Sequence, residues 1–366
     1  MKKLLQVLGS LSILVSSTAP IVSCTIPQKK NFSIDELIGK NIDTSNQKDD
    51  SNHEGMFTNY YTVGDSLSDT GALIGALNSK FNAGAKIEAP SYSNSFTNGD
   101  TAAKLLASKL GFENEEWGYA FNFMGQNHHG NNYAVGGATA SNVDNASGML
   151  LNNFKIYEQT VALIKQHKVK PTDLVFFEIG GNDLFQIINT PEKFQEQKID
   201  EAMANIEKAL LVLLNNGIRN IVVMNAPDVS KIPTYNTSDE KTIKNAANLS
   251  KEFNERFDLL FDKLDKKFPG ALKLFDLYTE FDKMLDIFEE DIAGGNSKKA
   301  CTVMKPDMSN ISQGLSIKVN YESGCSAQEI DKYFFFDAVH PTQWGHEYVA
   351  DKLFDLVKDF GGTKNA

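Results

Sequence analysis

The chain has few cysteines, few histidines and no run of basic residues, and each shortage excludes a class of protein. Among its three cysteines and six histidines, no pair has the spacing of zinc ligands, so we expect no metal site. The chain carries both basic and acidic residues, and an excess of acidic ones gives a net charge of −11, which argues against nucleic-acid binding. No internal repeat is present. A length of 366 residues with 41% hydrophobic residues predicts one large domain with extensions.

The N-terminus has the pattern of a targeting segment. A basic start is followed by a mainly apolar stretch, Leu4 to Val15, and by small residues. Ile21-Val22-Ser23-Cys24 resembles the lipobox of bacterial lipoproteins, in which the cysteine receives a diacylglyceryl group and becomes the mature N-terminus. The resemblance implies a signal peptide over residues 1–23 and a lipid-anchored protein on the extracellular face of the membrane. The alternatives are an ordinary cleaved signal peptide and an uncleaved anchor helix, although the apolar stretch is short for a spanning helix.

The next segment is polar and lacks apolar periodicity. From Thr25 to about Met56 charged and amide residues dominate, as in Asn46-Gln47-Lys48-Asp49-Asp50-Ser51-Asn52. This composition predicts a flexible tether. We therefore divide the chain into a signal peptide, a lipidated cysteine with its tether over residues 24–56, and a folded domain over residues 57–361.

The two remaining cysteines, Cys301 and Cys325, flank a segment rich in serine, asparagine and glycine. One disulfide closing such a loop fits an exported protein. Two unpaired thiols are the alternative, because sequence does not show whether the residues lie close together.

Beyond residue 57, short apolar runs alternate with longer helical patterns, which predicts an α/β fold with a mainly parallel sheet. Five candidate strands are Asn59–Val63, Asn132–Val135, Leu174–Ile179, Asn220–Asn225 and Leu272–Phe275. Candidate helices are Thr101–Leu110, Asn153–Gln166, Asp200–Asn215, Lys241–Lys267 and Trp344–Phe360.

Reactive and turn-forming residues follow these strands. Gly64-Asp65-Ser66-Leu67 follows the first strand, Gly136-Gly137 the second and Gly180-Gly181-Asn182-Asp183 the third, while Asp337-Ala338-Val339-His340-Pro341 lies near the other end of the chain. Ligands gather at the carboxyl ends of such strands. A serine hydroxyl needs a histidine to take its proton and a carboxylate to orient that histidine. Ser66, His340 and Asp337 supply all three.

These blocks, in this order, resemble the SGNH or GDSL hydrolase family, and the resemblance covers about residues 58–360. It implies a flavodoxin-like three-layer α/β/α sandwich with a mainly parallel five-stranded sheet. It also implies Ser66 as nucleophile, His340 as base and Asp337 as its partner. Ser66 N–H, Gly137 N–H and the Asn182 amide would form the oxyanion hole, with Gly136 as the alternative to Gly137. No metal or organic cofactor is implied.

Each block alone has a structural explanation. Gly-Asp-Ser-Leu and Gly-Gly-Asn-Asp are common in turns, and a histidine after an aspartate can be held by its neighbour. We interpret Asp65 and Asp183 as turn-forming residues, leave Asp69 open, assign Trp344 to packing and place His346 on the surface or at a helix cap. A segment from about 289 to 331 departs from the minimal fold and is expected to form a lid or rim of the pocket.

The resemblance implies a serine esterase or lipase acting on carboxylic esters. The segment Ser93 to Ala102 is similar to one in extracellular lipolytic and carbohydrate-ester members, so the partners expected are an ester substrate and, through the anchor, the membrane. Lipid or phospholipid esters are favoured. An acetylated glycan, and an inactive scaffold or adhesin, are the alternatives. Whether water or a second alcohol accepts the acyl group, and whether the protein oligomerises, stays open.

Overall fold

The computed structural model describes residues 34–112, 130–145, 147–307 and 314–360. The strands are β1 (Tyr60–Val63), β2 (Lys86–Ile87), β3 (Leu174–Glu178), β4 (Asn220–Met224), β5 (Leu272–Phe275), β6 (Asn296–Ala300), β7 (Thr302–Asp307), β8 (Ser316–Tyr321) and β9 (Tyr333–Phe335). The helices are α2 (Ala72–Phe81), α3 (Ala102–Lys109), α5 (Gly148–Leu151), α6 (Ile156–Gln166), α7 (Gly181–Ile188), α8 (Gln195–Asn215), α9 (Pro233–Asn236), α10 (Glu240–Lys267), α11 (Leu277–Asp291) and α12 (Gln343–Lys358). Short 3₁₀ turns are η1 (Ile34–Glu36), η2 (Glu192–Phe194), η3 (Val229–Lys231) and η4 (Ile330–Lys332).

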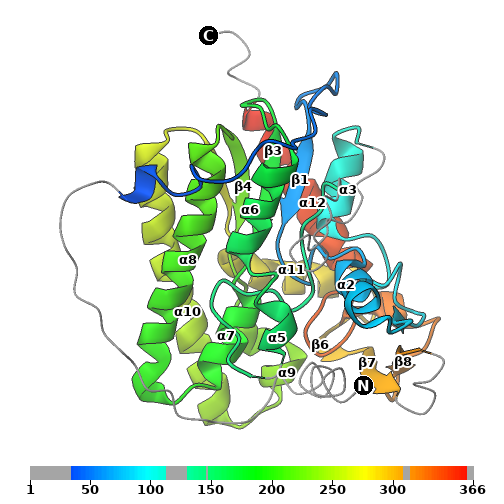
Figure 1. Ribbon diagram of the computed structural model, residues 1–366. Helices are drawn as coiled ribbons and strands as arrows, with labels where there is room; N and C mark the ends of the chain where they lie inside the picture. The colour runs from blue at the N-terminus through cyan, green and yellow to red at the C-terminus, as the bar shows by residue number, and fades with distance from the viewer. Residues whose placement is uncertain (1–33, 113–129, 146, 308–313, 361–366) are drawn as a thin grey trace.

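The central sheet is parallel and has the strand order β1-β3-β4-β5. Strand β3 reads Leu-Val-Phe-Phe-Glu and is buried along its whole length, as expected for a strand covered on both faces. Because β3, β4 and β5 follow one another in sheet order, right-handed crossovers put α8 and α10 on the same face. Helices α3 and α12 pack against each other on the opposite face, which completes three layers (Figure 1).

The sequence-based fold class is therefore confirmed, with one correction to the sheet. Four predicted strands are present to within one residue, whereas the fifth, Asn132–Val135, is reduced to an isolated bridge between Thr62 and Asn132. The segment still runs beside β1, since Tyr133 N–H donates to Thr62 O (2.7 Å). Its pairing ends where the chain turns at Gly136. With this edge segment counted, the order is the flavodoxin-like one.

Side-chain caps explain where several helices begin. The hydroxyl of Thr101 accepts a hydrogen bond from the N–H of Lys104 at the start of α3, and Asp239 and Asp276 cap α10 and α11 in the same way. Such caps satisfy backbone donors that the first helical turn leaves open. Helix α8 begins at Gln195, five residues before the predicted Asp200, and its first turn carries no side-chain cap bond.

The N-terminal arm, residues 34–56, packs on the domain instead of forming the predicted tether. Lys48 N–H donates to Gln166 O (2.7 Å), and Asp50 Oδ1 lies 3.1 Å from Nδ1 of the buried His167. The Ser51 hydroxyl is buried and donates to Asp173 Oδ2 (2.8 Å). The tether prediction is wrong for this arm because its polar side chains have partners far away in the sequence. Residues 24–33 lie outside the described ranges.

The predicted insertion builds secondary structure at the edge of the domain. Strand β7 pairs antiparallel with β8, β8 pairs with β2, and β6 pairs with β9. A disulfide joins Cys301 to Cys325, whose Cα atoms are 5.3 Å apart. This is the first of the two alternatives that the sequence left open. No helix in the described ranges is long and apolar enough to cross a membrane.

Candidate active site

Ser66 lies in the turn that leaves β1 at the carboxyl end of the sheet. Parallel strands end at the same edge, so the segments that follow β1, β3 and β4 meet there. The loop between β9 and α12 reaches this edge from the far end of the chain and carries Asp337 and His340. Ser66 keeps 9% of its surface exposed and lines the cavity described below.

The three predicted reactive side chains lie in line. His340 Nε2 is 2.7 Å from Ser66 Oγ, and His340 Nδ1 is 2.9 Å from both carboxylate oxygens of Asp337. Asp337 Oδ1 also accepts the backbone N–H groups of Val339 and His340, each at 2.8 Å. Asp337 accepts hydrogen bonds only, so the Nδ1 proton faces it and Nε2 is left to accept the proton of Ser66.

The charges around the imidazole favour its protonated form. Burial opposes a charge on His340, but the carboxylates of Asp337 and Asp65 outweigh it and raise the pKa of His340 above 6.5. Burial likewise favours neutral Asp337, but its attraction to His340 and its hydrogen bonds lower the pKa of Asp337 below 3.8. The pair can therefore accept a proton from Ser66 and stabilise the imidazolium that results.

The backbone N–H groups of Ser66 and Gly137 have no acceptor in the described parts of the chain. The N–H of Gly136, by contrast, donates to Asp69 Oδ2 (2.6 Å). Gly137 has a φ of +81°, a backbone conformation that residues other than glycine rarely adopt. The geometry thus favours Gly137 over Gly136 as a backbone donor.

Asn182, the third predicted donor, is already engaged. It is the second residue of α7 and is buried, and its Nδ2 donates to Ala138 O (3.0 Å) and to Asp65 Oδ2 (3.2 Å). An oxyanion beside Ser66 would have to take or share one of these two hydrogens. The sequence predicted Asn182 at the site but not that its amide already donates two hydrogen bonds.

Two buried carboxylates, Asp69 and Asp183, hold the loops around Ser66. Asp69 accepts the backbone N–H groups of Gly71, Ala72, Leu73 and Gly136. Asp183 accepts those of Ala140 and Ser141, each at 2.9 Å. Asp183 therefore anchors a distant loop instead of its own turn, and Asp69, which the sequence left open, joins the Ser66 loop to the Gly136 loop.

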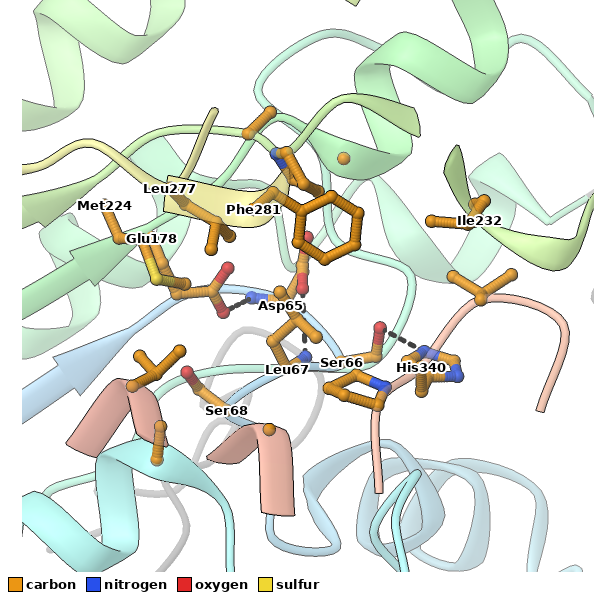
Figure 2. A pocket seen from close by; sticks show the side chains of 18 of the residues that line it. Asp65, Ser66, Leu67, Ser68, Glu178, Met224, Ile232, Leu277, Phe281 and His340 are labelled. Carbon is orange, nitrogen blue, oxygen red and sulfur yellow. Dashed lines mark hydrogen bonds between the residues drawn. The ribbon is translucent and has the colours of Figure 1, made fainter. Parts of the chain in front are cut away.

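An apolar cavity extends from Ser66 under the carboxyl edge of the sheet. Figure 2 shows Ser66 and His340 at one end and Met224 and Glu178 at the other, with Phe281 between them. Most of the residues that line the cavity are apolar, among them Phe185, Met224, Val229, Ile232, Leu277, Phe281, Met284, Phe334, Phe335 and Val349. No residue in the described part of 289–331 lines it, so the structure gives no support to the expected lid or rim.

Trp344 and His346 follow His340 closely in the sequence, and the structure can be compared with the place predicted for each. Trp344 stacks on Tyr348 (ring centroids 5.4 Å apart) and meets Phe288 edge to face, as the packing assignment predicted. His346 was expected at the surface or at a helix cap; it is buried and lines the cavity, and it accepts a hydrogen bond at the N-terminus of α3, as the helix-cap alternative predicted. Its Nδ1 accepts the N–H of Ala102 (3.2 Å), and burial lowers the pKa of His346 to about 3. The surface assignment was wrong because α12 places this face of its first turn against α3.

Sequence reasoning missed two residues at the site. The ring of Phe96 lies 5.0 Å from that of His340 and packs beside Gly136. Glu178 ends β3 with a buried carboxyl beside Asp65. A glutamate that closes an otherwise apolar strand is a signal that the sequence did contain.

A parallel α/β sheet with serine, histidine and aspartate aligned at its carboxyl edge is an arrangement found in hydrolases. The sequence model of the GDSL-like lipase/acylhydrolase family matches residues 60–353. The chain belongs to this family and is an ester-bond hydrolase of the GDSL type.

Individual relatives are similar at modest identity. The chain is 26% identical to the thermolabile hemolysin of Vibrio parahaemolyticus over 302 residues, which are 80% of this chain and 62% of the hemolysin. It is 26% identical to the GDSL esterase/lipase At1g74460 of Arabidopsis thaliana over 84% of this chain and 90% of the plant protein. The secreted effector protein SseJ of Salmonella typhimurium is 25% identical over 89% of this chain and 70% of the effector. The chain thus spans less than two thirds of the hemolysin.

Proposed function

We propose that the protein is a serine esterase that cleaves carboxylic esters of lipids through a covalent acyl-enzyme. The observation that carries this proposal is the position of Ser66, which is in hydrogen-bond contact with His340 and faces an apolar cavity. Family membership supports the reaction class. The cavity supports an acyl chain as the part of the substrate that the protein recognises.

The mechanism follows from the hydrogen bonds. Ser66 Oγ attacks the ester carbonyl while Nε2 of His340 takes its proton, and Asp337 holds the imidazolium. The N–H groups of Ser66 and Gly137, with the amide of Asn182, would stabilise the oxyanion. Collapse breaks the bond to the leaving oxygen, which receives the proton from His340. Water, deprotonated by the same histidine, then attacks the acyl carbon and releases the acid and Ser66.

A chain-length series tests the substrate class. We expect the full chain to hydrolyse p-nitrophenyl butyrate about 15-fold better in kcat/KM than the acetate, because two methylenes buried in the cavity contribute about 0.8 kcal/mol each. Longer esters should improve further until the cavity at Met224 is full.

Met224 provides a matched pair of variants. Met224→Phe fills the far end of the cavity and should lower kcat/KM for long esters while leaving acetate unchanged, whereas Met224→Leu keeps the volume and should behave as the parent. Preference for acetate in the parent would contradict the lipid proposal and favour an acetylated glycan. A folded parent that hydrolyses none of these esters would favour an inactive scaffold.

We also propose that the protein is attached to the outer face of the cell membrane by a lipid on Cys24. The basic and apolar start of the chain and the lipobox-like Ile21-Val22-Ser23-Cys24 support this. In detergent phase separation of cells expressing the full chain, the protein should enter the detergent phase, and Cys24→Ser should move it out of that phase. Equal partition of the two would argue against lipidation.

A further inference from the structure

Two buried carboxyl groups, those of Asp65 and Glu178, lie behind Ser66 and take no part in the mechanism above. Their residues are 3% and 2% exposed, and both line the cavity that Ser66 faces (Figure 2). Neither forms an ion pair with a lysine or arginine in the described ranges. Two buried anions side by side repel each other and lose their hydration, so such a pair holds a proton.

Glu178 fixes the start of the serine turn. Its Oε1 accepts the backbone N–H of Asp65 at 2.7 Å, as the dashed line in Figure 2 marks. A side chain at Gly64 would collide with the same oxygen, so the glycine of Gly-Asp-Ser-Leu is required by the carboxyl of Glu178. Gly64, just before the turn, therefore leaves the space that the Glu178 carboxyl occupies at the end of β3.

Asp65 extends this support to the oxyanion side of the site. Its Oδ1 accepts the N–H of Leu67 (3.0 Å), which closes the turn around Ser66, and its Oδ2 accepts Nδ2 of Asn182 (3.2 Å). A continuous path of hydrogen bonds therefore runs from Glu178 through Asp65 to the Ser66 turn and to Asn182.

The hydrogen bonds favour the proton on Glu178, because the Asp65 carboxylate accepts two N–H groups, from Leu67 and Asn182, whereas Glu178 accepts one, from Asp65. Burial raises the pKa of Asp65 to about 6, although the Leu67 N–H and the charge of His340 act against burial. Burial raises the pKa of Glu178 well above 4.5, and the neighbouring Asp65 carboxyl adds to this rise. The other titratable groups around the pair are Asp183, which opposes the Asp65 charge, and His346, which lines the cavity from α12.

We propose that Glu178 is a positioning residue of the esterase site, present as a neutral carboxylic acid that holds the serine turn and keeps the Asp65 carboxylate on Asn182. This inference rests on the proposed function. Through Asp65, Glu178 sets the aim of the Ser66 N–H and of the Asn182 amide. Removing one oxyanion donor typically lowers kcat by about 10²- to 10³-fold, which sets the scale for a donor that is turned away from the oxyanion.

Two variants at position 178 separate this role from a charged one. Glu178→Gln keeps a neutral acceptor for the Asp65 N–H and has an N–H donor in place of the proposed carboxylic O–H. We expect kcat within about threefold of the parent and an unmoved acid limb of the pH profile. Glu178→Leu has neither group, and we expect kcat for p-nitrophenyl acetate to fall about 10²-fold with little change in KM.

Two kinetic results would overturn the proposal. One is a Glu178→Gln variant whose kcat falls as far as that of the leucine variant, or whose acid limb moves to lower pH, because either would mean that position 178 acts as an anion. The other is a folded Glu178→Leu variant with the kcat of the parent. If the leucine variant does not fold, the glutamine variant decides.

Infrared spectroscopy tests the protonation of Glu178 independently of any activity. At pH 8 the parent-minus-Glu178→Gln difference spectrum should contain the C=O stretch of a protonated carboxylic acid. Its absence from folded protein would contradict the proposal. A parent that cleaves no ester but shows this band would refute the proposed function alone.

Discussion

Replacing Ser66 by alanine is expected to lower kcat for p-nitrophenyl butyrate by about 10⁴- to 10⁶-fold. The substitution removes the oxygen atom that lies in hydrogen-bond contact with the base, while His340 and Asp337 keep their own hydrogen bonds. What remains would come from binding and from the oxyanion donors. Initial rates of the parent and the variant at saturating ester measure the effect.

Folding must be separated from chemistry in that comparison. Ser66 occupies a turn held by Asp65 through the N–H of Leu67, and its own hydroxyl contacts His340 alone among the described residues. Ser66→Ala should therefore melt at nearly the temperature of the parent. Ser68→Ala is a matched control, because it removes a second buried hydroxyl from the same turn and leaves the hydrogen bond between Ser66 and His340 in place. Undiminished turnover in Ser66→Ala would remove the whole assignment.

The second large effect is expected for Asp337→Asn, with kcat lower by about 10⁴-fold. The asparagine oxygen can still accept the N–H groups of Val339 and His340, so the loop should keep its shape. Its amide nitrogen, however, is a donor and cannot receive the Nδ1 proton of His340. The imidazole then places its proton on Nε2 and has no lone pair for Ser66.

The pH profile distinguishes this loss from simple misfolding. The base must be neutral, so kcat/KM of the parent should fall as the pH drops through the pKa of His340, which lies above 6.5. Asp337 is a main cause of that raised pKa, so the residual activity of Asp337→Asn should lose its acid limb at a lower pH. An acid limb at the same pH in both proteins would exclude His340 as the base paired with Asp337.

Periodicity and motif order made much of the fold and site predictable. Parallel strands buried on both faces read as short apolar runs, which is why β1, β3, β4 and β5 agree with their predictions to within one residue. The carboxyl ends of parallel strands share an edge, so residues that follow different strands in the sequence come together. Because Ser66 follows β1 and Asn182 follows β3, this rule alone predicts that the two residues lie close together.

Three features that the sequence did not reveal share a physical cause, because each depends on a polar residue whose partner lies far along the chain. The N-terminal arm reads as a tether because the bonds from Ser51 to Asp173 and from Asp50 to His167 leave no periodic trace. His346 is buried because α12 packs against α3, and the sequence pattern of α12 alone does not reveal this packing. Glu178 reads as an anomaly in an apolar strand until the N–H of Asp65 is placed beside it.

The central claim is that Ser66 becomes acylated, and the most direct measurement is the mass of the protein after rapid acid quench during turnover of p-nitrophenyl butyrate. The account predicts a butyryl adduct that peptide mapping places on the segment containing Ser66, absent from Ser66→Ala and still formed in Ser68→Ala. An adduct on another residue, or turnover that persists in Ser66→Ala, would contradict it.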